Sequence, residues 1–177
     1  MTEAVQQDAV LEQTRERFGG RLLDVRTGAD CATVVVGRDD LIELAIFLRD
    51  TPGLRFVRLI DVCGVDYLGL ERTPRFATVY HLHSLELMKY LRIRVDLDED
   101  DLVVTSVTGV WPGANYQERD VFDMFGIVFA GHPDLKRIFL PDEWVGYPLR
   151  KDYEQTPEPI EFSFNPEQWQ KAVQRGD

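Results

Sequence analysis

The segments FVRLID (residues 56–61), FATVYHLH (76–83), LRIRVDL (91–97) and VVTSVTGV (103–110) decide the expected fold. Each is short and rich in β-branched and aromatic residues, which is typical of a β-strand. The connections between them are short or polar, and this favours antiparallel neighbours. The middle of the chain is therefore predicted to be a block of strands.

One helix and two further strands are expected before this block. Residues 3–18 carry a weak apolar stripe and are followed by two glycines, which predicts a helix that ends there. Two strands, at residues 22–26 and 32–36, flank a turn at residues 27–30. These elements account for the N-terminal part of the chain.

Two more helices complete the predicted elements. Asp39 or Asp40 can cap the first, which extends to about Arg49 and has four apolar residues on one face: Leu41, Leu44, Ala45 and Leu48. The second covers residues 114–125, and Gly126 is placed to end it. Together the elements predict an α+β fold with a largely antiparallel sheet of four to six strands flanked by helices.

The chain is expected to divide into a single α+β domain (residues 1–151) and an extended tail (152–177). Six prolines punctuate residues 133–166, and the tail carries six acidic and two basic residues with little periodicity. Because it also contains Phe162, Phe164 and Trp169, we expect it to bind a partner, although it could also fold back on its own domain. Residues 96–101 hold five acids in six positions but lack the glycine and terminal glutamate of an EF-hand, so a solvated hairpin turn is expected there.

The composition excludes several classes of protein. With 31 acidic and 20 basic residues the chain has a net charge of −11, which opposes nonspecific binding to nucleic acid or to anionic lipid. No apolar run approaches the roughly 18 residues of a membrane-spanning helix. The N-terminal residues lack the apolar segment of a signal peptide, so a reducing cytoplasm is the expected compartment.

No cofactor or metal is expected in this chain. Cys31 and Cys63 are far apart, whereas an iron–sulfur cluster usually needs four thiolates or two with histidines. His81 and His83 lie on one face of a predicted strand, but nothing supplies a third metal ligand, so packed histidines are favoured. Cys63 has no evident activating base and is expected to pack in the core. The glycine-rich nucleotide-binding motifs are absent.

A charged cluster lies on the helix at residues 114–125 and in the segment after it. Paired carboxylates can perform acid–base catalysis, but the alternating signs of these charges favour an ion-pair network with a structural or interface role. Arg119 and Asp123 can pair at i,i+4 spacing. The cluster comprises Glu118, Arg119, Asp120, Asp123, Lys136, Arg137, Arg150 and Lys151.

The same region carries a family resemblance. The motifs ERDVFDMFG (118–126), HPDLKRI (132–138) and GYPLRKD (146–152) together resemble the 30-kDa subunit of respiratory complex I, which is the C subunit of bacterial NADH-quinone oxidoreductase. Asp120 stands where the family usually has glutamate, and Tyr116 where tryptophan is frequent. The expected structural and interface residues are Glu118, Arg119, Asp123, Gly126, His132, Pro133, Arg137, Pro148, Arg150, Lys151 and Asp152.

The resemblance implies a component of the hydrophilic arm that has no catalytic residue of its own. It would pack on the 49-kDa-like subunit (the D subunit of the bacterial enzyme) and lie near the iron–sulfur subunits, on the cytoplasmic face of the bacterial inner membrane. FMN and the Fe–S clusters would reside in these partners, which pass electrons from NADH to quinone while the complex pumps protons. Membrane-bound hydrogenases and the photosynthetic NAD(P)H dehydrogenase-like complex contain related subunits and remain alternatives, as does a free-standing binding module.

Overall fold

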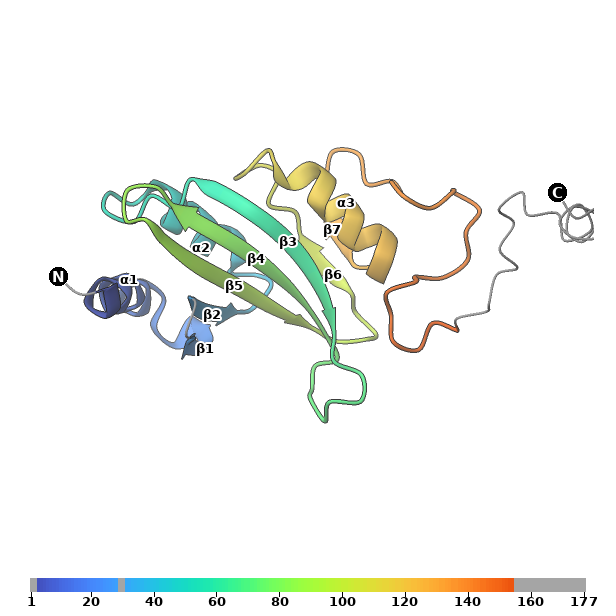
Figure 1. Ribbon diagram of the computed structural model, residues 1–177, viewed down its shortest axis with the longest axis horizontal. Coiled ribbons are helices and arrows are strands. Elements are labelled where there is room, and N and C mark those ends of the chain that lie inside the picture. Colours follow the sequence, from blue (N-terminus) through green and yellow to red (C-terminus); the bar gives the residue numbers. More distant parts are fainter. Residues whose placement is uncertain (1–2, 29–30, 155–177) are drawn as a thin grey trace, which may run out of the picture.

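The computed structural model describes residues 3–28 and 31–154 (Figure 1). From residue 155 onward, the predicted tail lies outside the described residues. The elements are α1 (Glu3–Phe18), the short 3-10 helix η1 (Gly19–Arg21), β1 (Leu22–Thr27), β2 (Ala32–Val36), α2 (Leu41–Asp50), β3 (Arg58–Asp66), β4 (Phe76–Ser84), β5 (Lys89–Leu97), β6 (Val103–Thr105), α3 (Ala114–Phe125) and β7 (Val128–Ala130).

The main sheet has five strands in the order β1-β2-β5-β4-β3. The pairs β1–β2, β4–β5 and β3–β4 are antiparallel, which confirms the predicted α+β fold with a largely antiparallel sheet. β2 pairs in parallel with β5, and this pair joins the predicted block of strands to the N-terminal strands, for which no direction was predicted. A long connection through α2, β3 and β4 separates these two strands, and such a connection allows the chain to return in the same direction.

The prediction of a long strand at residues 103–110 is wrong, because only Val103–Thr105 is a strand. The expected antiparallel neighbour is also wrong for this segment, since β6 pairs in parallel with β7 in a separate two-stranded sheet. The backbone N–H of Val107 instead donates to the Glu118 carboxylate on α3, at 2.7 Å, which ends the strand. Residues 98–101 form an exposed turn as expected, but they link β5 to β6 across two sheets and are therefore not a hairpin turn.

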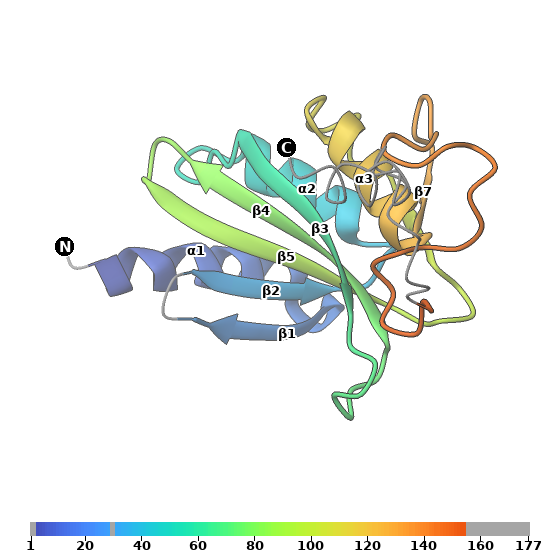
Figure 2. The same ribbon diagram turned by 45° about the vertical axis from the view of Figure 1, so that its right-hand side comes forward.

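The three helices lie on one face of the main sheet (Figures 1 and 2). The core between these layers is apolar, with Val34, Tyr80 and Ile93 of the sheet fully buried together with Leu44 of α2. Gly64 on β3 allows α3 to approach closely, because a Cβ atom there would lie 2.5 Å from the Phe125 ring. The opposite face of the sheet carries no helix of the described chain (Figure 2).

The N-terminal end of α2 differs from its predicted cap. Asp40 occupies the N-cap position, but its side chain makes no capping hydrogen bond. Its carboxylate pairs instead with Arg21 of η1, at 3.0 Å. Across residues 3–28 and 31–154, no helix combines the length and the apolar character that crossing a membrane would need.

Candidate functional site

Asp123 is the centre of the charged cluster at α3. Its side chain is fully buried, and its Oδ1 accepts a hydrogen bond from Nη1 of Arg137 at 2.8 Å. Its Oδ2 accepts three backbone N–H groups, from Ile138, Phe139 and Leu140, at 2.9, 2.8 and 3.1 Å. Burial alone would raise the pKa of Asp123, but the four donors outweigh it and hold that pKa below its ordinary value. One carboxylate therefore fixes the turn of the chain at residues 137–140.

Two arginines extend this arrangement through carbonyl oxygens. Arg137 also donates to the carbonyls of Trp144 and Gly146, each at 3.3 Å. The sequence predicted that Arg119 could pair with Asp123. Arg119 instead donates to the carbonyls of Lys136 and Arg137 at 3.0 and 3.2 Å. The i,i+4 spacing thus suggested the wrong partner, because the returning chain brings Arg137 to Asp123.

The end of α3 is tied to the segment that follows it by Gly126 and Arg150. Gly126 ends the helix as predicted, with a φ of 74° that favours glycine. A Cβ atom there would lie 2.5 Å from the Tyr147 ring and 2.6 Å from the Arg150 guanidinium. Arg150 donates through Nε to the Phe125 carbonyl at 2.7 Å and lies over the Tyr147 ring. Pro148, in the same segment, is half-buried.

Asp66 forms a second buried centre at the end of β3. Arg75 donates to both of its oxygens, at 3.0 and 2.9 Å, and the backbone N–H of Lys151 donates to Oδ2 at 2.9 Å. Burial opposes ionisation here too, yet these donors hold the pKa of Asp66 at about 2. Arg75 also pairs with Asp152 at 2.8 Å, while the Lys151 ammonium donates to the Leu68 carbonyl.

Arg75 is a residue that sequence reasoning missed. No local pattern marks it, since it stands in a polar connection between two strands. Its role follows from the antiparallel register of β3 and β4, which pairs Asp66 with Phe76 and so brings the neighbouring Arg75 to Asp66. Arg75 could have been found from the sequence only by predicting the correct hairpin register for residues 58–84.

Glu118 and His132 hold the loops around the start of α3. Glu118 is fully buried and accepts hydrogen bonds from the Ser106 hydroxyl at 2.6 Å and from the Val107 N–H. Burial raises the pKa of Glu118. The Nδ1 atom of His132 accepts the N–H of Asp134, so its Nε2 carries the proton and donates to the Asn115 carbonyl at 3.0 Å. Pro133, next to it, is exposed.

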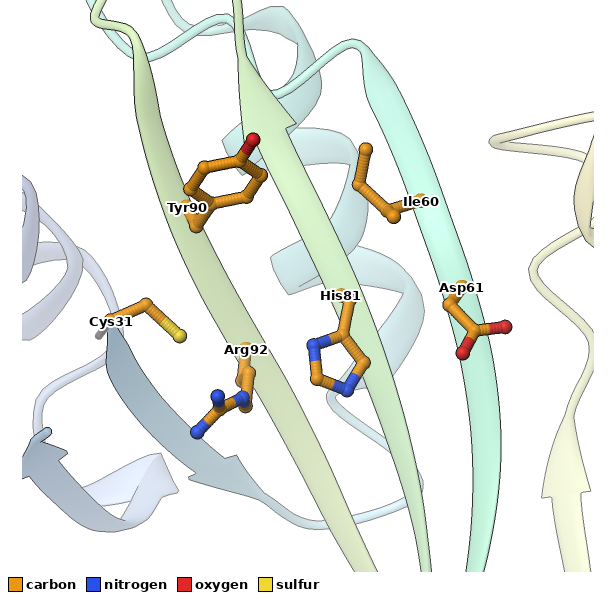
Figure 3. A pocket seen from close by; sticks show the side chains of 6 residues that line it. All are labelled: Cys31, Ile60, Asp61, His81, Tyr90 and Arg92. Atoms are coloured by element: carbon orange, nitrogen blue, oxygen red, sulfur yellow. The ribbon is translucent and has the colours of Figure 1, made fainter.

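The helix-free face of the sheet has two shallow hollows that share His81 and Arg92. One is about 320 Å³ and is lined by Cys31, Ile60, Asp61, His81, Tyr90 and Arg92 (Figure 3). The other is about 270 Å³. His83 is buried and stacks on Tyr90 at 4.5 Å, as expected for a packed strand histidine. Within the described part of the chain, no group of three or more His, Cys, Asp or Glu residues could hold a metal ion.

The expectation that Cys63 packs in the core is wrong, because it lies only partly buried on this helix-free face. It is nevertheless poorly suited to react. Its thiol donates to Oδ2 of Asp61 at 2.9 Å. Burial, together with the neighbouring carboxylate of Asp61, raises the pKa of Cys63 to about 12. The thiolate needed for nucleophilic or metal chemistry is therefore scarce at neutral pH.

Comparison with known proteins identifies the family. Residues 34–159 match the model of the family described as "Respiratory-chain NADH dehydrogenase, 30 Kd subunit". The NADH-quinone oxidoreductase C subunit of Roseiflexus sp. (strain RS-1) is 46% identical over 162 residues, which is 92% of each chain. The NADH-quinone oxidoreductase C/D subunit of Psychrobacter cryohalolentis is 45% identical over 151 residues, but these make up only 25% of its length.

Two solved structures share the fold of this chain. A structure described as "Nqo5 of the trypsin-resistant fragment (1-134) in P63 form" aligns with a TM-score of 0.63 and 34% identity, covering 73% of this chain and 99% of that one. A chain of the membrane-bound sulfane sulfur reductase, an archaeal respiratory membrane complex, aligns with a TM-score of 0.69 over 92% of this chain; at 20% identity, this likeness shows the fold alone. By family match and by relatives at 46% identity, the chain belongs to the family of the 30-kDa subunit, or C subunit, of NADH-quinone oxidoreductase, the complex I of respiratory chains.

Proposed function

We propose that this chain is the non-redox subunit of the peripheral arm of a proton-translocating NADH:quinone oxidoreductase, and that it docks on the 49-kDa-like subunit. In this role it supports electron transfer from NADH through FMN and Fe–S clusters to quinone without carrying a redox group. The assembly holds it at the cytoplasmic face of the bacterial cell membrane, and its own task is to position the partners.

The observation that carries this proposal is the use of the motif residues. Four charged side chains of the motif spend their hydrogen bonds on one another and on the backbone of residues 123–146; they are Asp123, Arg137, Arg119 and Arg150. An acid–base or cofactor site needs such groups to face a cavity that admits a substrate. Groups that hold a segment of their own chain in place instead build a rigid scaffold, and the role of such a scaffold is to position other proteins.

The fused relatives support the 49-kDa-like subunit as the partner. In the Psychrobacter C/D protein, the part similar to this chain is joined to a much longer sequence in one polypeptide. Fusion keeps two folded units at a high effective concentration, which favours a direct contact between them. The iron–sulfur subunits of the complex are the further proposed neighbours.

The redox groups are proposed to lie in the other subunits. The chain has two cysteines, and one of them has a thiol pKa of about 12 because of burial and Asp61. Iron–sulfur clusters are bound through thiolates, usually four of them. Flavin and cluster chemistry is therefore assigned to the partner chains.

The test is purification of the tagged full chain from native membranes in mild detergent. We expect the 49-kDa-like and iron–sulfur subunits to elute with it, together with the flavin and Fe–S signals of the complex. The full chain produced alone is expected to show neither flavin absorbance nor an Fe–S EPR signal. Elution as a stable, partner-free monomer would favour a free-standing module, and stoichiometric iron in the chain alone would contradict a non-redox role.

A further inference from the structure

Glu118 is a buried carboxyl that stands outside the ion pairs of its own motif. Its side chain is fully buried. Its donors are the Ser106 hydroxyl at 2.6 Å and the Val107 N–H at 2.7 Å. Within the part of the chain that the structure describes, no lysine or arginine pairs with it, so the expected ion-pair network does not include it. A charge buried without a cation beside it is costly, and the neutral form of this carboxyl is therefore favoured.

Asp123, further along the same helix, shows the opposite arrangement. It is equally buried but has four donors, and one of them is the Arg137 guanidinium. The two donors of Glu118 are both uncharged. Burial thus works against the charge of both carboxyls, but only Asp123 has enough donors to keep its charge. Such a pair of carboxyls, with pKa values that their surroundings push apart, can perform two different tasks.

A chain of hydroxyls links Glu118 to the half-buried Thr108. The Ser106 Oγ lies 2.6 Å from Oε2 of Glu118 and 2.7 Å from Oγ1 of Thr108. Because a hydroxyl both donates and accepts, this chain fits either charge state of the carboxyl. Ser106 donates to the ionised carboxylate, whereas it accepts from the neutral carboxyl and then donates to Thr108. The carboxyl can therefore gain or lose a proton while the heavy atoms keep their places.

The backbone that Glu118 holds is the junction between β6 and α3. The N–H of Val107 donates to Glu118, and the carbonyl of Val107 accepts from the N–H groups of Val110 and Trp111 at 2.9 and 2.8 Å. The indole of Trp111 in turn donates to the Phe56 carbonyl at 3.2 Å. One carboxyl thus fixes the turn from which α3 starts.

The titratable groups that act on Glu118 from neighbouring elements supply no fixed positive charge. His132, after β7, interacts with it electrostatically, but the imidazole is neutral while its Nδ1 accepts the N–H of Asp134. Tyr80 of β4 is fully buried and has no positively charged state. Only a positively charged His132 would offset the charge of Glu118, and that state would break the hydrogen bond from Asp134.

We propose that Glu118 is a proton-operated lock on the junction between β6 and α3. The neutral carboxyl holds Ser106 and Val107; when its proton leaves through the Ser106 and Thr108 hydroxyls, a charge without a cation remains in the core and the junction loosens. This property belongs to the chain itself and does not depend on the proposed function.

The sign of the pH dependence follows from the burial of the carboxyl. Burial raises the pKa of Glu118 in the folded chain above its ordinary value of 4.5. The contribution of the neutral carboxyl to stability is therefore fully present below the unfolded pKa, and it is lost as the pH rises through the folded pKa. Asp123 behaves in the opposite sense, because its folded pKa is lowered.

Glu118→Gln tests the lock, because glutamine has the shape of the neutral acid and can both accept from Val107 and donate to Ser106. Wild type and variant, each as the full chain, are unfolded in urea between about pH 4.5 and 8.5. We expect similar stability near pH 4.5. Above it, the folding equilibrium constant of wild type should fall relative to that of the variant, by about tenfold per pH unit until the folded carboxyl ionises. Asp123→Asn, the matched control on the same helix, should instead be less stable than wild type at neutral pH.

Two further measurements complete the test. NMR of the full chain labelled with carbon-13 in its glutamate carboxyls should show one resonance that titrates above the others and is absent from Glu118→Gln; this labelling excludes Asp120, whose pKa burial also raises. Hydrogen exchange of the Val107 N–H should be faster in wild type than in the variant at about pH 8, and equal near pH 4.5.

The outcomes that would overturn the proposal are distinct. A ratio of the two folding constants that stays flat across this pH range would show that Glu118 titrates normally, as would glutamate resonances that all titrate together. Equal exchange of the Val107 N–H at about pH 8 would show that the proton does not control the junction. If Glu118→Gln does not fold, the NMR titration of wild type decides alone.

Discussion

Replacing Asp123 with asparagine tests whether the buried carboxylate organises the segment after α3. The substitution keeps the size and shape of the side chain, so it opens no cavity. It removes the negative charge that Arg137 faces at 2.8 Å and places an NH₂ group among four hydrogen-bond donors. Whichever way the amide turns, its NH₂ group meets either the guanidinium or the three backbone N–H groups.

The expected cost follows from these contacts. In the better orientation the amide oxygen keeps the three backbone donors, and Arg137 loses its carboxylate partner while remaining 13% exposed. Breaking a buried ion pair in this way costs about 3–5 kcal/mol. For a chain of this size, each kcal/mol lowers the melting temperature by about 2–4 °C, so Asp123→Asn should lower it by roughly 6–20 °C.

The assay is thermal unfolding of the full chain, followed by circular dichroism. The matched control is Asp134→Asn, the same substitution in the same segment, because Asp134 pairs with Lys136 while 57% and 68% of the two side chains are exposed. Exposed pairs contribute little, so this variant should melt within about 2 °C of wild type. If Asp123→Asn melts no lower than Asp134→Asn, the organising role assigned to Asp123 is wrong.

Three further predictions concern pH, backbone geometry and thiol reactivity. Because the pKa of Asp66 is held at about 2, its contribution to stability is present above the unfolded pKa near 4 and is lost as the pH falls towards 2. Measured by urea unfolding, the free energy of unfolding of wild type should fall over this pH range, and Asp66→Asn should remove about 2 kcal/mol of that fall. Gly126→Ala should lower the melting temperature more than Gly131→Ala, since both positions have a positive φ but only Gly126 has side chains within 3 Å of the added Cβ; equal losses would refute this. With a pKa of about 12, Cys63 should be alkylated by iodoacetamide at pH 8 far more slowly than a peptide thiol. Asp61→Asn should speed this reaction, and an unchanged rate would show that Asp61 does not contribute to the raised pKa of Cys63.

Local signals in the sequence identified most elements of the fold. The helix at residues 114–125 and its end at Gly126 agree with α3, because helix periodicity and a C-terminal glycine act over a few residues. The same holds for the strands at 22–26 and 32–36, which agree with β1 and β2 within one residue. These features depend on neighbours in the chain and could therefore be inferred without the tertiary structure.

Long-range contacts decided the features that sequence reasoning missed or got wrong. Residues 103–110 have strand composition throughout, yet Glu118 takes the Val107 N–H that a strand would need. The parallel pairing of β2 with β5 joins segments more than fifty residues apart. The partner of Asp123 depends on how the chain returns past α3, which i,i+4 spacing cannot reveal. The position of the motif was thus found from the sequence, but the ion pairs and hydrogen bonds within it became known only from the tertiary structure.

The positional role of this chain is tested most directly by NADH oxidation with an artificial electron acceptor, measured per assembled flavin in an Arg137→Ala strain. Native gels give the amount of assembled complex, and flavin content normalises the rate. We predict that the amount of assembled complex falls while the rate per flavin stays equal to wild type, because the proposed function assigns the flavin chemistry to other subunits. Full assembly combined with a lost acceptor-linked rate would contradict this account and would assign Arg137 a direct part in catalysis.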